Sequence, residues 1–468
     1  MGSEVPFFPE QLIHGVLALS AGLFAASFLL IVYAIGRRIR HEQDFKLLDE
    51  FRRNLLAIFA ALHGGALSYD AALEQVGALF CRRFQLRMEQ IFLEHLKVPA
   101  DHANVKKMAQ DLGFVDHWRH CLGLELRDRA RKRGARLRFH AARFFTRALN
   151  AENLGAIGHG GSWKLLSRSL LDPNADVQRV ALRSLAAIGA PESFLVLAEH
   201  LQKTLAQPET KLSERDFLAA LACFPLGLSG HLLPLLRHSN PKIRRLAAQI
   251  LIQMTAAQEA ESGGSHLEDA ERGPEIAELI LSQLAADRDA EIRARAAVLL
   301  ARVRDDRARE QLRQLLNDEV WFVRLHAVRS IARQRDAGSL ALLPASLTEA
   351  HWRVREAAAH SLARWGAAGI NQLVRTFLST HDAYAREQIA EELETSGELA
   401  RMLARCAANG AGQEFEVLKE IVRMGKTGYL QSAMEARGRT SQRTAVLSTL
   451  AESSDPEVQE WANHMRVQ

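Results

Sequence analysis

Residues 287–302, DRDAEIRARAAVLLAR, decide the fold, because two close copies of this stretch follow at a constant spacing. Residues 318–333 read DEVWFVRLHAVRSIAR, and residues 349–364 read EAHWRVREAAAHSLAR. Each copy begins 31 residues after the previous one. A period of this length is typical of helical repeat arrays, in which neighbouring repeats must stack to bury their apolar faces.

Particular residue types recur in register within the copies. An arginine returns every 31 residues, as Arg293, Arg324, Arg355 and Arg386. In the first three copies an alanine follows three residues later and a large apolar residue seven residues later. An acid precedes the arginine by six residues in those copies, as Asp287, Asp318 and Glu349. The fourth copy has Thr380 at the acid position, and there the pattern weakens.

This pattern resembles HEAT repeats in their short bacterial form, also called phycobilisome-lyase-like, and the resemblance covers residues 165–468. It implies that each repeat is a pair of antiparallel helices, with the acid before the second helix and the arginine inside it. The acid can then cap free N–H groups at the helix start. The arginine can reach the acids of its own or the next repeat. We therefore predict an all-α fold with an α-solenoid at residues 165–468.

One spacing in the array is too long. Arg244 and Arg293 are 49 residues apart, one period plus 18 residues. The excess falls in residues 256–274, which contain Ser262-Gly-Gly-Ser265 and five acids. We expect an acidic insertion without regular structure between two helices.

Two stripes of side chains recur in the same register. Arg302, Arg333 and Arg364 occupy one position of successive second helices, and Trp321 and Trp352 lie just before the second helix. These residues predict a binding surface for an acidic segment, with the two rings as anchors. The alternative is a solvated cationic face together with packing between repeats.

The N-terminal part differs in composition from the repeats. Residues 12–35 contain no Lys, Arg, Asp or Glu, and a helix of this length spans about 36 Å. That is enough to cross a hydrocarbon core of about 30 Å. Acids precede the segment, and Arg37, Arg38 and Arg40 follow it. We therefore expect an uncleaved transmembrane helix after a short periplasmic N-terminus at residues 1–11, with the remaining chain on the cytoplasmic side.

Small residues recur on one face of the expected transmembrane helix, as Ala18, Gly22 and Ala26. This spacing lets a second membrane helix approach closely. The alternative is the ordinary alanine and glycine content of an apolar helix.

Residues 36–155 predict a helical juxtamembrane module. A helix over 42–63 ends at Gly64-Gly65, and Ser68 is the expected N-cap of a second helix that runs to Leu96. The glycine-rich residues 156–164 predict a linker into the repeats.

The juxtamembrane module contains the most basic segment of the chain, residues 127–147. Its candidate anion-binding residues are Arg131, Lys132, Arg133, Arg136 and Arg138. Such a cluster attracts anionic lipid or phosphate-bearing ligands. Alternatively it is a solvated helix face, or its arginines pair with acids elsewhere in the fold.

Composition excludes several function classes. The net charge of +5 is small for 468 residues, so nucleic acid is not expected as a partner. The four cysteines lie far apart and form no CxxC, which argues against a disulfide framework or a zinc site. No catalytic motif accompanies the repeats, so we expect neither a catalytic site nor a cofactor or metal site.

Together these features predict a bacterial inner-membrane scaffold that binds a protein partner, including an integral membrane protein. The architecture resembles anchored HEAT proteins that accompany membrane glycosyltransferases in exopolysaccharide export. Two alternatives remain open: a chromophore-lyase-like enzyme, and a receptor that binds an anionic second messenger through residues 127–147.

Overall fold

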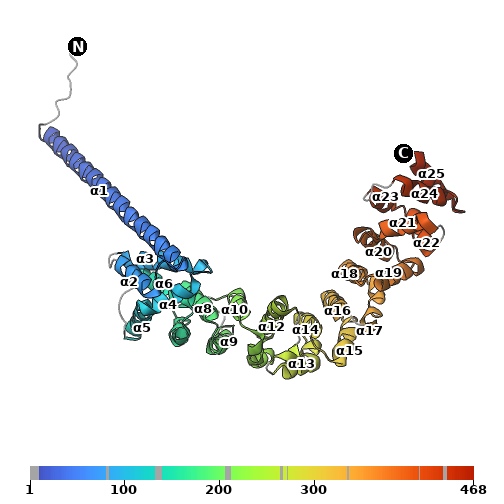
Figure 1. Ribbon diagram of the computed structural model, residues 1–468, viewed down its shortest axis with the longest axis horizontal. Helices are drawn as coiled ribbons and strands as arrows, with labels where there is room; N and C mark the ends of the chain where they lie inside the picture. Colours follow the sequence, from blue (N-terminus) through green and yellow to red (C-terminus); the bar gives the residue numbers. More distant parts are fainter. Residues whose placement is uncertain are drawn as a thin grey trace, which may run out of the picture. The chain divides into compact units, whose positions relative to one another are not determined.

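The computed structural model describes residues 10–80, 84–131, 140–205, 212–263, 267–270, 272–334, 337–409, 412–435 and 440–467. Within these ranges all regular secondary structure is helical (Figure 1), as the sequence predicts. The chain divides into two compact units, Met1–Ile188 and Gly189–Gln468. The first unit therefore extends beyond the linker expected at residues 156–164.

The first unit consists of eight α-helices and two short 3₁₀ turns in its described residues. Their bounds are α1 Glu10–His63, α2 Tyr69–Leu79, α3 Gln85–Glu94, η2 His95–Lys97, α4 His102–Asp111, α5 Phe114–Arg131, α6 His140–Ile157, η3 Gly160–Ser162, α7 Trp163–Ser169 and α8 Ala175–Ile188.

Helix α1 is a single element of 54 residues, which corresponds to a length of about 80 Å. Among the described residues, no helix has the length and apolar character needed to cross a membrane. The transmembrane helix expected at residues 12–35 is therefore wrong, and so is the single-pass inner-membrane localisation that depended on it. The expectation rested on the absence of charged residues from 12–35, whereas in the structure this segment is the first part of a 54-residue helix that continues to His63.

The described side chains of α1 show where the apolar run is interrupted. Arg37 follows soon after Ile35, and the same helix continues through charged residues to His63. Of the three small residues expected to pack in a membrane, Ala26 is exposed, and the side chains of Ala18 and Gly22 lie outside those described. The exopolysaccharide link and the integral membrane partner lose the observation on which they rested.

The C-terminal part of α1 packs on α2 and α3 through aromatic rings. Phe51 of α1 lies edge-on to Phe80, with ring centroids 5.2 Å apart, and Phe80 contacts Phe114 at 4.7 Å. Trp118 is fully buried, and its Nε1 donates to Glu89 Oε2 over 2.7 Å. Ser68 caps α2 as predicted, but the helix expected to reach Leu96 is interrupted after Leu79.

Helices α6 and α8 approach each other closely in the first unit. Gly155 of α6 faces Ser184 of α8, and a Cβ on Gly155 would lie 2.5 Å from the Ser184 Cβ. Because real Cβ atoms do not approach this closely, glycine sets the distance between the two helices.

The second unit comprises the remaining helices, drawn from green to red in Figure 1. Their bounds are α9 Pro191–Leu205, α10 Glu214–Leu221, η4 Leu226–Leu232, α11 Leu233–Leu236, α12 Pro241–Ser262, η5 Leu267–Asp269, α13 Gly273–Ser282, η6 Leu284–Ala286, α14 Ala290–Leu300, α15 Asp306–Leu315, α16 Trp321–Gln334, α17 Ala337–Leu340, η7 Pro344–Thr348, α18 Trp352–Ala363, α19 Ala367–Ser379, α20 Ala383–Thr395, α21 Glu398–Asn409, α22 Gln413–Arg423, α23 Thr427–Glu435, α24 Thr440–Ala451 and α25 Pro456–Val467.

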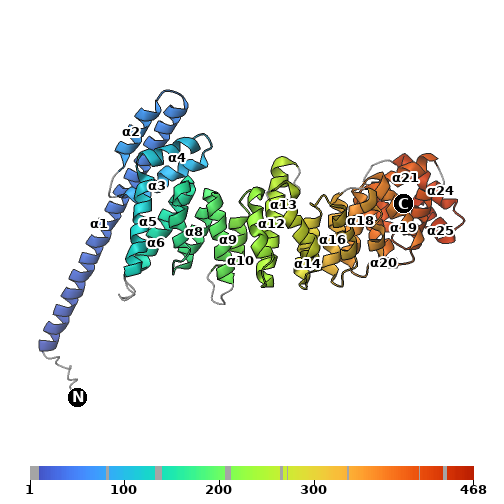
Figure 2. The same cartoon turned by 90° about the horizontal axis from the view of Figure 1, so that it is seen from below.

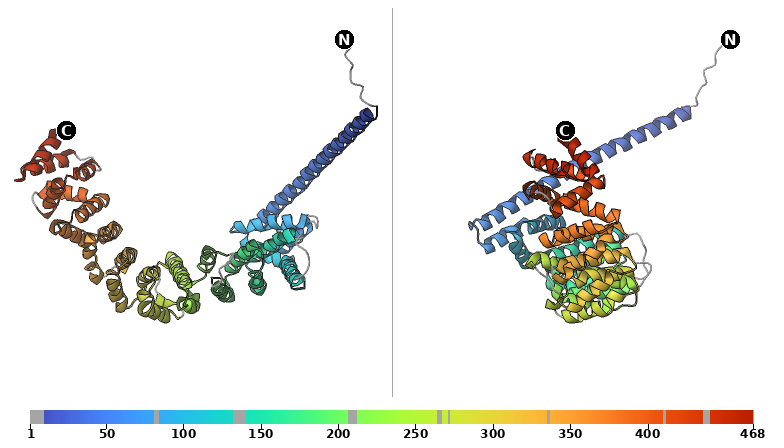
Figure 3. Two further views of the ribbon diagram at one scale, coloured as in Figure 1. Left: turned by 180° about the vertical axis from the view of Figure 1, so that it is seen from behind. Right: turned by 90° about the vertical axis from the view of Figure 1, so that its right-hand side faces the viewer.

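The helices of the second unit stack as repeated pairs (Figures 2 and 3). Helices α12, α14, α16, α18 and α20 pack one on the next and form a single row. The alanine and large apolar positions of the sequence pattern lie between neighbouring helices of this row. All six are completely buried: Ala296, Ala327, Ala358, Leu300, Ile331 and Leu362.

The segment expected as an irregular acidic insertion differs from that expectation. Residues 256–262 continue helix α12, and a short turn follows at Leu267–Asp269. Leu267 is completely buried, and its N–H donates to the Arg302 carbonyl over 3.1 Å. An apolar anchor and a longer helix therefore hold the described part of this segment on the repeats.

Replacing Gly155 with alanine is expected to destabilise the first unit by about 1–3 kcal/mol, because the added methyl group forces α6 and α8 apart. Thermal unfolding followed by circular dichroism measures the change. Gly123→Ala is the matched control: it also lies inside a helix, but its Cβ would be 3.8 Å from the nearest side-chain atom. An unchanged midpoint for Gly155→Ala would contradict the close approach.

Candidate binding surfaces of the repeats

The recurring arginine joins each repeat to the next. Arg293 Nε donates to Asp318 Oδ2 over 2.7 Å, and Arg324 Nη2 donates to Glu349 Oε2 over 2.9 Å. In each of these pairs the acid lies 25 residues after the arginine. The acid of one repeat thus receives the arginine of the previous one.

The same guanidinium also contacts its own repeat. Arg293 Nη1 donates to the Asp287 carbonyl over 3.0 Å, and Arg324 Nη1 donates to the Asp318 carbonyl over 2.7 Å. The Asp318 carboxylate additionally accepts the Val320 N–H over 2.9 Å, which caps the start of α16. One arginine and one acid therefore fix both the helix start and the stacking of two repeats.

Arg355 shows what happens where the acid is missing. It donates to the Glu349 carbonyl over 2.7 Å, but the next repeat offers Thr380 instead of a carboxylate. Its guanidinium lies over the Tyr384 ring, 5.6 Å from the centroid. A cation–π contact takes the place of the ion pair at this step.

The arginine–acid pairing also occurs in the first unit, and it bears out for Arg147 the alternative that arginines of residues 127–147 pair with acids elsewhere. Arg147 Nε donates to Asp172 Oδ2 over 2.8 Å, and both side chains are almost completely buried. Their separation of 25 residues equals that of Arg293 and Asp318, so the spacing could have revealed this pair. Arg147 belongs to the repeat pairing and not to an exposed anion site.

The other candidates of the basic segment are not placed by the structure. Lys132, Arg133, Arg136 and Arg138 lie outside the described residues, and the side chain of Arg131 is not among those described. Binding of lipid or of an anionic messenger by residues 127–147 stays a prediction.

The arginine stripe divides into three different environments. Arg302 is only 4% exposed, and its Nε donates to Glu259 Oε1 of α12 over 3.0 Å. Burial lowers the pKa of Arg302 from its ordinary value, although the Glu259 carboxylate opposes this. Arg333 is half exposed and contacts the same Glu259, whereas Arg364 is exposed. Only Arg333 and Arg364 are therefore accessible to a partner.

A pocket of about 540 Å³ lies between α16 and α18 beside the accessible arginines. It is lined by Arg329, Ala332, Arg333, His360, Ser361, Arg364 and Trp365. His360 Nδ1 lies 3.3 Å from Glu392 Oε1 of α20. Burial raises the pKa of Glu392, while His360 acts in the opposite direction.

The two tryptophans lie at the opposite ends of the same helices. Trp321 begins α16 and Trp352 begins α18, whereas Arg333 and Arg364 lie at the helix ends. A helix of 14 residues is about 21 Å long, so the rings and the arginines do not form one surface. The single binding surface that the sequence predicted for these arginines and tryptophans is therefore divided between the two ends of the helices.

The tryptophans belong to a set of rings and cations at the starts of the successive helices α16, α18 and α20. We call this set the aromatic strip: Trp321, His351, Trp352, Arg353 and Tyr384. The His351 ring stacks on Trp321 with centroids 3.9 Å apart and an interplanar angle of 2°. The Arg353 guanidinium lies 5.6 Å from the centroid of Trp321 and 5.2 Å from that of Trp352.

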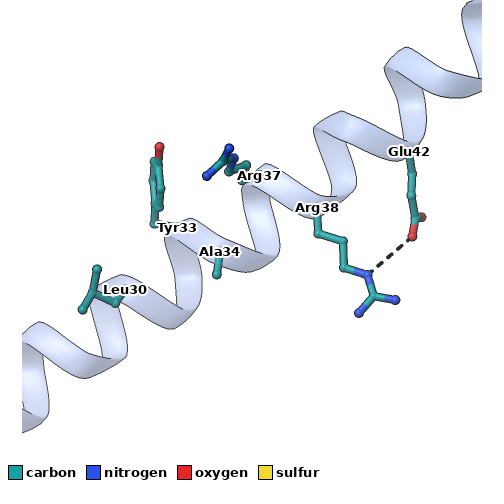
Figure 4. A pocket seen from close by; sticks show the side chains of 6 residues that line it. All are labelled: Leu30, Tyr33, Ala34, Arg37, Arg38 and Glu42. Atoms are coloured by element: carbon teal, nitrogen blue, oxygen red, sulfur yellow. Dashed lines mark ion pairs between the residues drawn. The ribbon is translucent and has the colours of Figure 1, made fainter.

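Another hollow lies along α1 (Figure 4). Leu30, Tyr33, Ala34, Arg37, Arg38 and Glu42 line it, and Arg38 pairs with Glu42 over 3.7 Å. All six come from one helix, so no second element converges on it. Helical spacing alone accounts for this row of side chains.

Residues 277–363 match the family model described as HEAT repeats. These repeats are HEAT repeats. The match covers the regular arginine copies and less than half of the chain. No curated protein matches the sequence.

Several solved structures are similar in arrangement. An engineered protein is 19% identical, with a TM-score of 0.33, over 75% of this chain and 98% of the other. Kap121p is 12% identical, with a TM-score of 0.47, over 87% of this chain and 45% of the other. The complex of CpcE and CpcF of phycocyanin lyase from Nostoc sp. PCC7120 is 18% identical, with a TM-score of 0.23, over 55% of this chain and 92% of the other. The chain thus spans less than half the length of Kap121p.

Replacing Asp318 with asparagine is expected to lower the free energy of unfolding by about 3 kcal/mol at pH 7, because the largely buried Arg293 loses its buried carboxylate partner and keeps only the exposed Glu319 at 3.3 Å. Burial alone would raise the pKa of Asp318, but the hydrogen bond from Arg293 holds that pKa below its ordinary value. The stabilisation is therefore present above the pKa of the unfolded carboxyl, about 4, and is lost as the pH falls below it.

Urea unfolding of both proteins at pH 7 and pH 3 measures this dependence. The difference between wild type and Asp318→Asn should shrink at pH 3. Asp306→Asn is the control, because Asp306 is 94% exposed in its pair with Arg309 and should change the midpoint little at either pH. Equal effects of the two substitutions at pH 7 would contradict the role of the buried pair.

Proposed function

We propose that this chain is a protein-interaction scaffold that holds a protein partner on its HEAT repeats and catalyses no reaction itself. The observation that carries the proposal is the exposure of the aromatic strip: Trp352 is 53% exposed and Tyr384 is 71% exposed. Tryptophan, tyrosine and arginine are the residues that contribute most to the binding energy of protein interfaces.

The aromatic strip is held in place before any partner arrives. His351 caps α18 by accepting the Arg353 N–H, and the same ring is stacked on Trp321. Arg353 lies within cation–π distance of both tryptophans. Because these side chains are already ordered, they lose less conformational entropy when a partner binds.

The strip suits a particular kind of partner segment. The faces of Trp352 and Tyr384 offer apolar surface, and Arg353 offers a cation between rings. A segment with apolar side chains beside a carboxylate complements this combination. The strip lies on successive repeats, so an extended segment can contact both exposed rings.

The chemistry of a buried thiol also supports a non-catalytic role. Burial raises the pKa of Cys406 to about 11, so this side chain is protonated at neutral pH. The thiolate is the nucleophilic form of cysteine. Cys406 is therefore better suited to packing than to covalent catalysis.

Replacing Trp352 and Tyr384 together with alanine is expected to abolish capture of the partner, because the two exposed rings are removed. The buried apolar contacts and the arginine–acid pairs between repeats remain, and only the cation–π contact of Arg355 with Tyr384 is lost from the stack. The experiment is affinity purification with the full chain as bait from lysates of the source cells, followed by quantitative mass spectrometry. Proteins enriched by the wild type should be depleted at least tenfold by the variant, which corresponds to interface side chains of about 2 kcal/mol or more.

Leu195→Ala is the matched control, because Leu195 is an exposed apolar side chain on α9 and outside the strip. It should retain every partner that the wild type retains. If the double variant and the control capture the same proteins, the aromatic strip is not the binding surface.

A further inference from the structure

The pocket between α16 and α18 has a composition that the scaffold proposal does not use. It lies at the C-terminal ends of these helices, away from the aromatic strip at their N-termini. Three arginines line it, Arg329 and Arg333 from α16 and Arg364 from the end of α18. Guanidinium groups are planar forks whose geometry matches phosphate and carboxylate oxygens.

Among the described residues at this pocket, the arginines outnumber the carboxylates that pair with them. Glu259 is shared between the buried Arg302 and the accessible Arg333. Glu392 faces His360. The structure gives Arg329 and Arg364 no ion pair with any described residue. One carboxylate therefore serves two arginines, and two further arginines have no counter-charge among the residues that the structure describes.

The Trp365 ring gives the pocket an apolar wall. Trp365 lines the pocket together with Ala332. Binding sites for small molecules combine such apolar surface with a few polar groups that orient the ligand. Here the arginines are the polar groups.

We propose that this pocket binds a small molecule that carries phosphate groups. A carboxylate brings one negative charge, whereas a phosphate monoester brings nearly two and has three acceptor oxygens, which matches two arginines that pair with no described acid. The pocket volume of about 540 Å³ is larger than a single phosphate needs and lies within the usual range for small-molecule sites. The non-phosphate part of the ligand packs on Ala332 and the Trp365 ring.

Glu259 indicates how the protein behaves when the pocket is empty. Its carboxylate already contacts Arg333 from inside the chain, as an anion would from outside. A phosphate that binds Arg329 and Arg364 meets an Arg333 already held in place. The site is thus partly ordered before binding.

The experiment is isothermal titration calorimetry of the full chain with inorganic pyrophosphate, compared with citrate as a carboxylate of similar charge. The wild type is expected to bind pyrophosphate saturably at one site and citrate at least tenfold more weakly. Arg364→Glu should weaken pyrophosphate binding at least tenfold, because a charge-assisted contact becomes repulsive.

Arg375→Glu is the matched control, because it makes the same change of charge on the exposed side of α19, outside the pocket. It should bind pyrophosphate as the wild type does. Equal weakening by Arg364→Glu and Arg375→Glu would show a general response to net charge and would overturn the proposal. Stronger binding of citrate than of pyrophosphate would also overturn it.

Discussion

The buried arginine–carboxylate pair between successive repeats is the constraint on which the repeat stack depends. A helix pair cannot bury its apolar face alone, so each repeat needs a neighbour at a fixed position. Arg293 and Asp318 supply this position by joining the inside of one second helix to the start of the next. Packing of alanines against large apolar side chains stabilises the stack, and the ion pair sets its register.

This register determines where binding residues can lie. Because α16 and α18 are held side by side, residues that begin the helices align on one edge and residues that end them align on the other. Aromatic rings gather on the first edge and arginines on the second. The same side-by-side packing of the helices therefore produces both surfaces. One carries aromatic rings and the other arginines, so they suit different ligands.

The repeat stack could be predicted from sequence because its residues recur at a constant spacing. Asp287, Arg293 and Ala296 mark positions that are buried or paired in the structure, and their copies behave alike except at Arg355, whose acid is missing. Absence of charge was a weaker guide, because it led to a membrane helix that the described residues do not contain. For residues 127–147 the sequence left two alternatives open, an anion site or arginines paired with distant acids, and Arg147 follows the second, with a partner 25 residues away.

The binding face could be predicted only in part, because burial of one arginine depends on a distant acid. Glu259 reaches Arg302 across 43 residues and Arg333 across 74, and neither separation belongs to the repeat period. The extension of α12 that carries Glu259 arises from the 18 extra residues of the array. The longer α12 thus brings the Glu259 carboxylate to Arg302 and Arg333. Arg329 and Arg364 have no ion pair with a described residue. Because of this irregular repeat, Arg302 is buried in an ion pair, whereas Arg364 at the equivalent position is exposed and can bind a ligand.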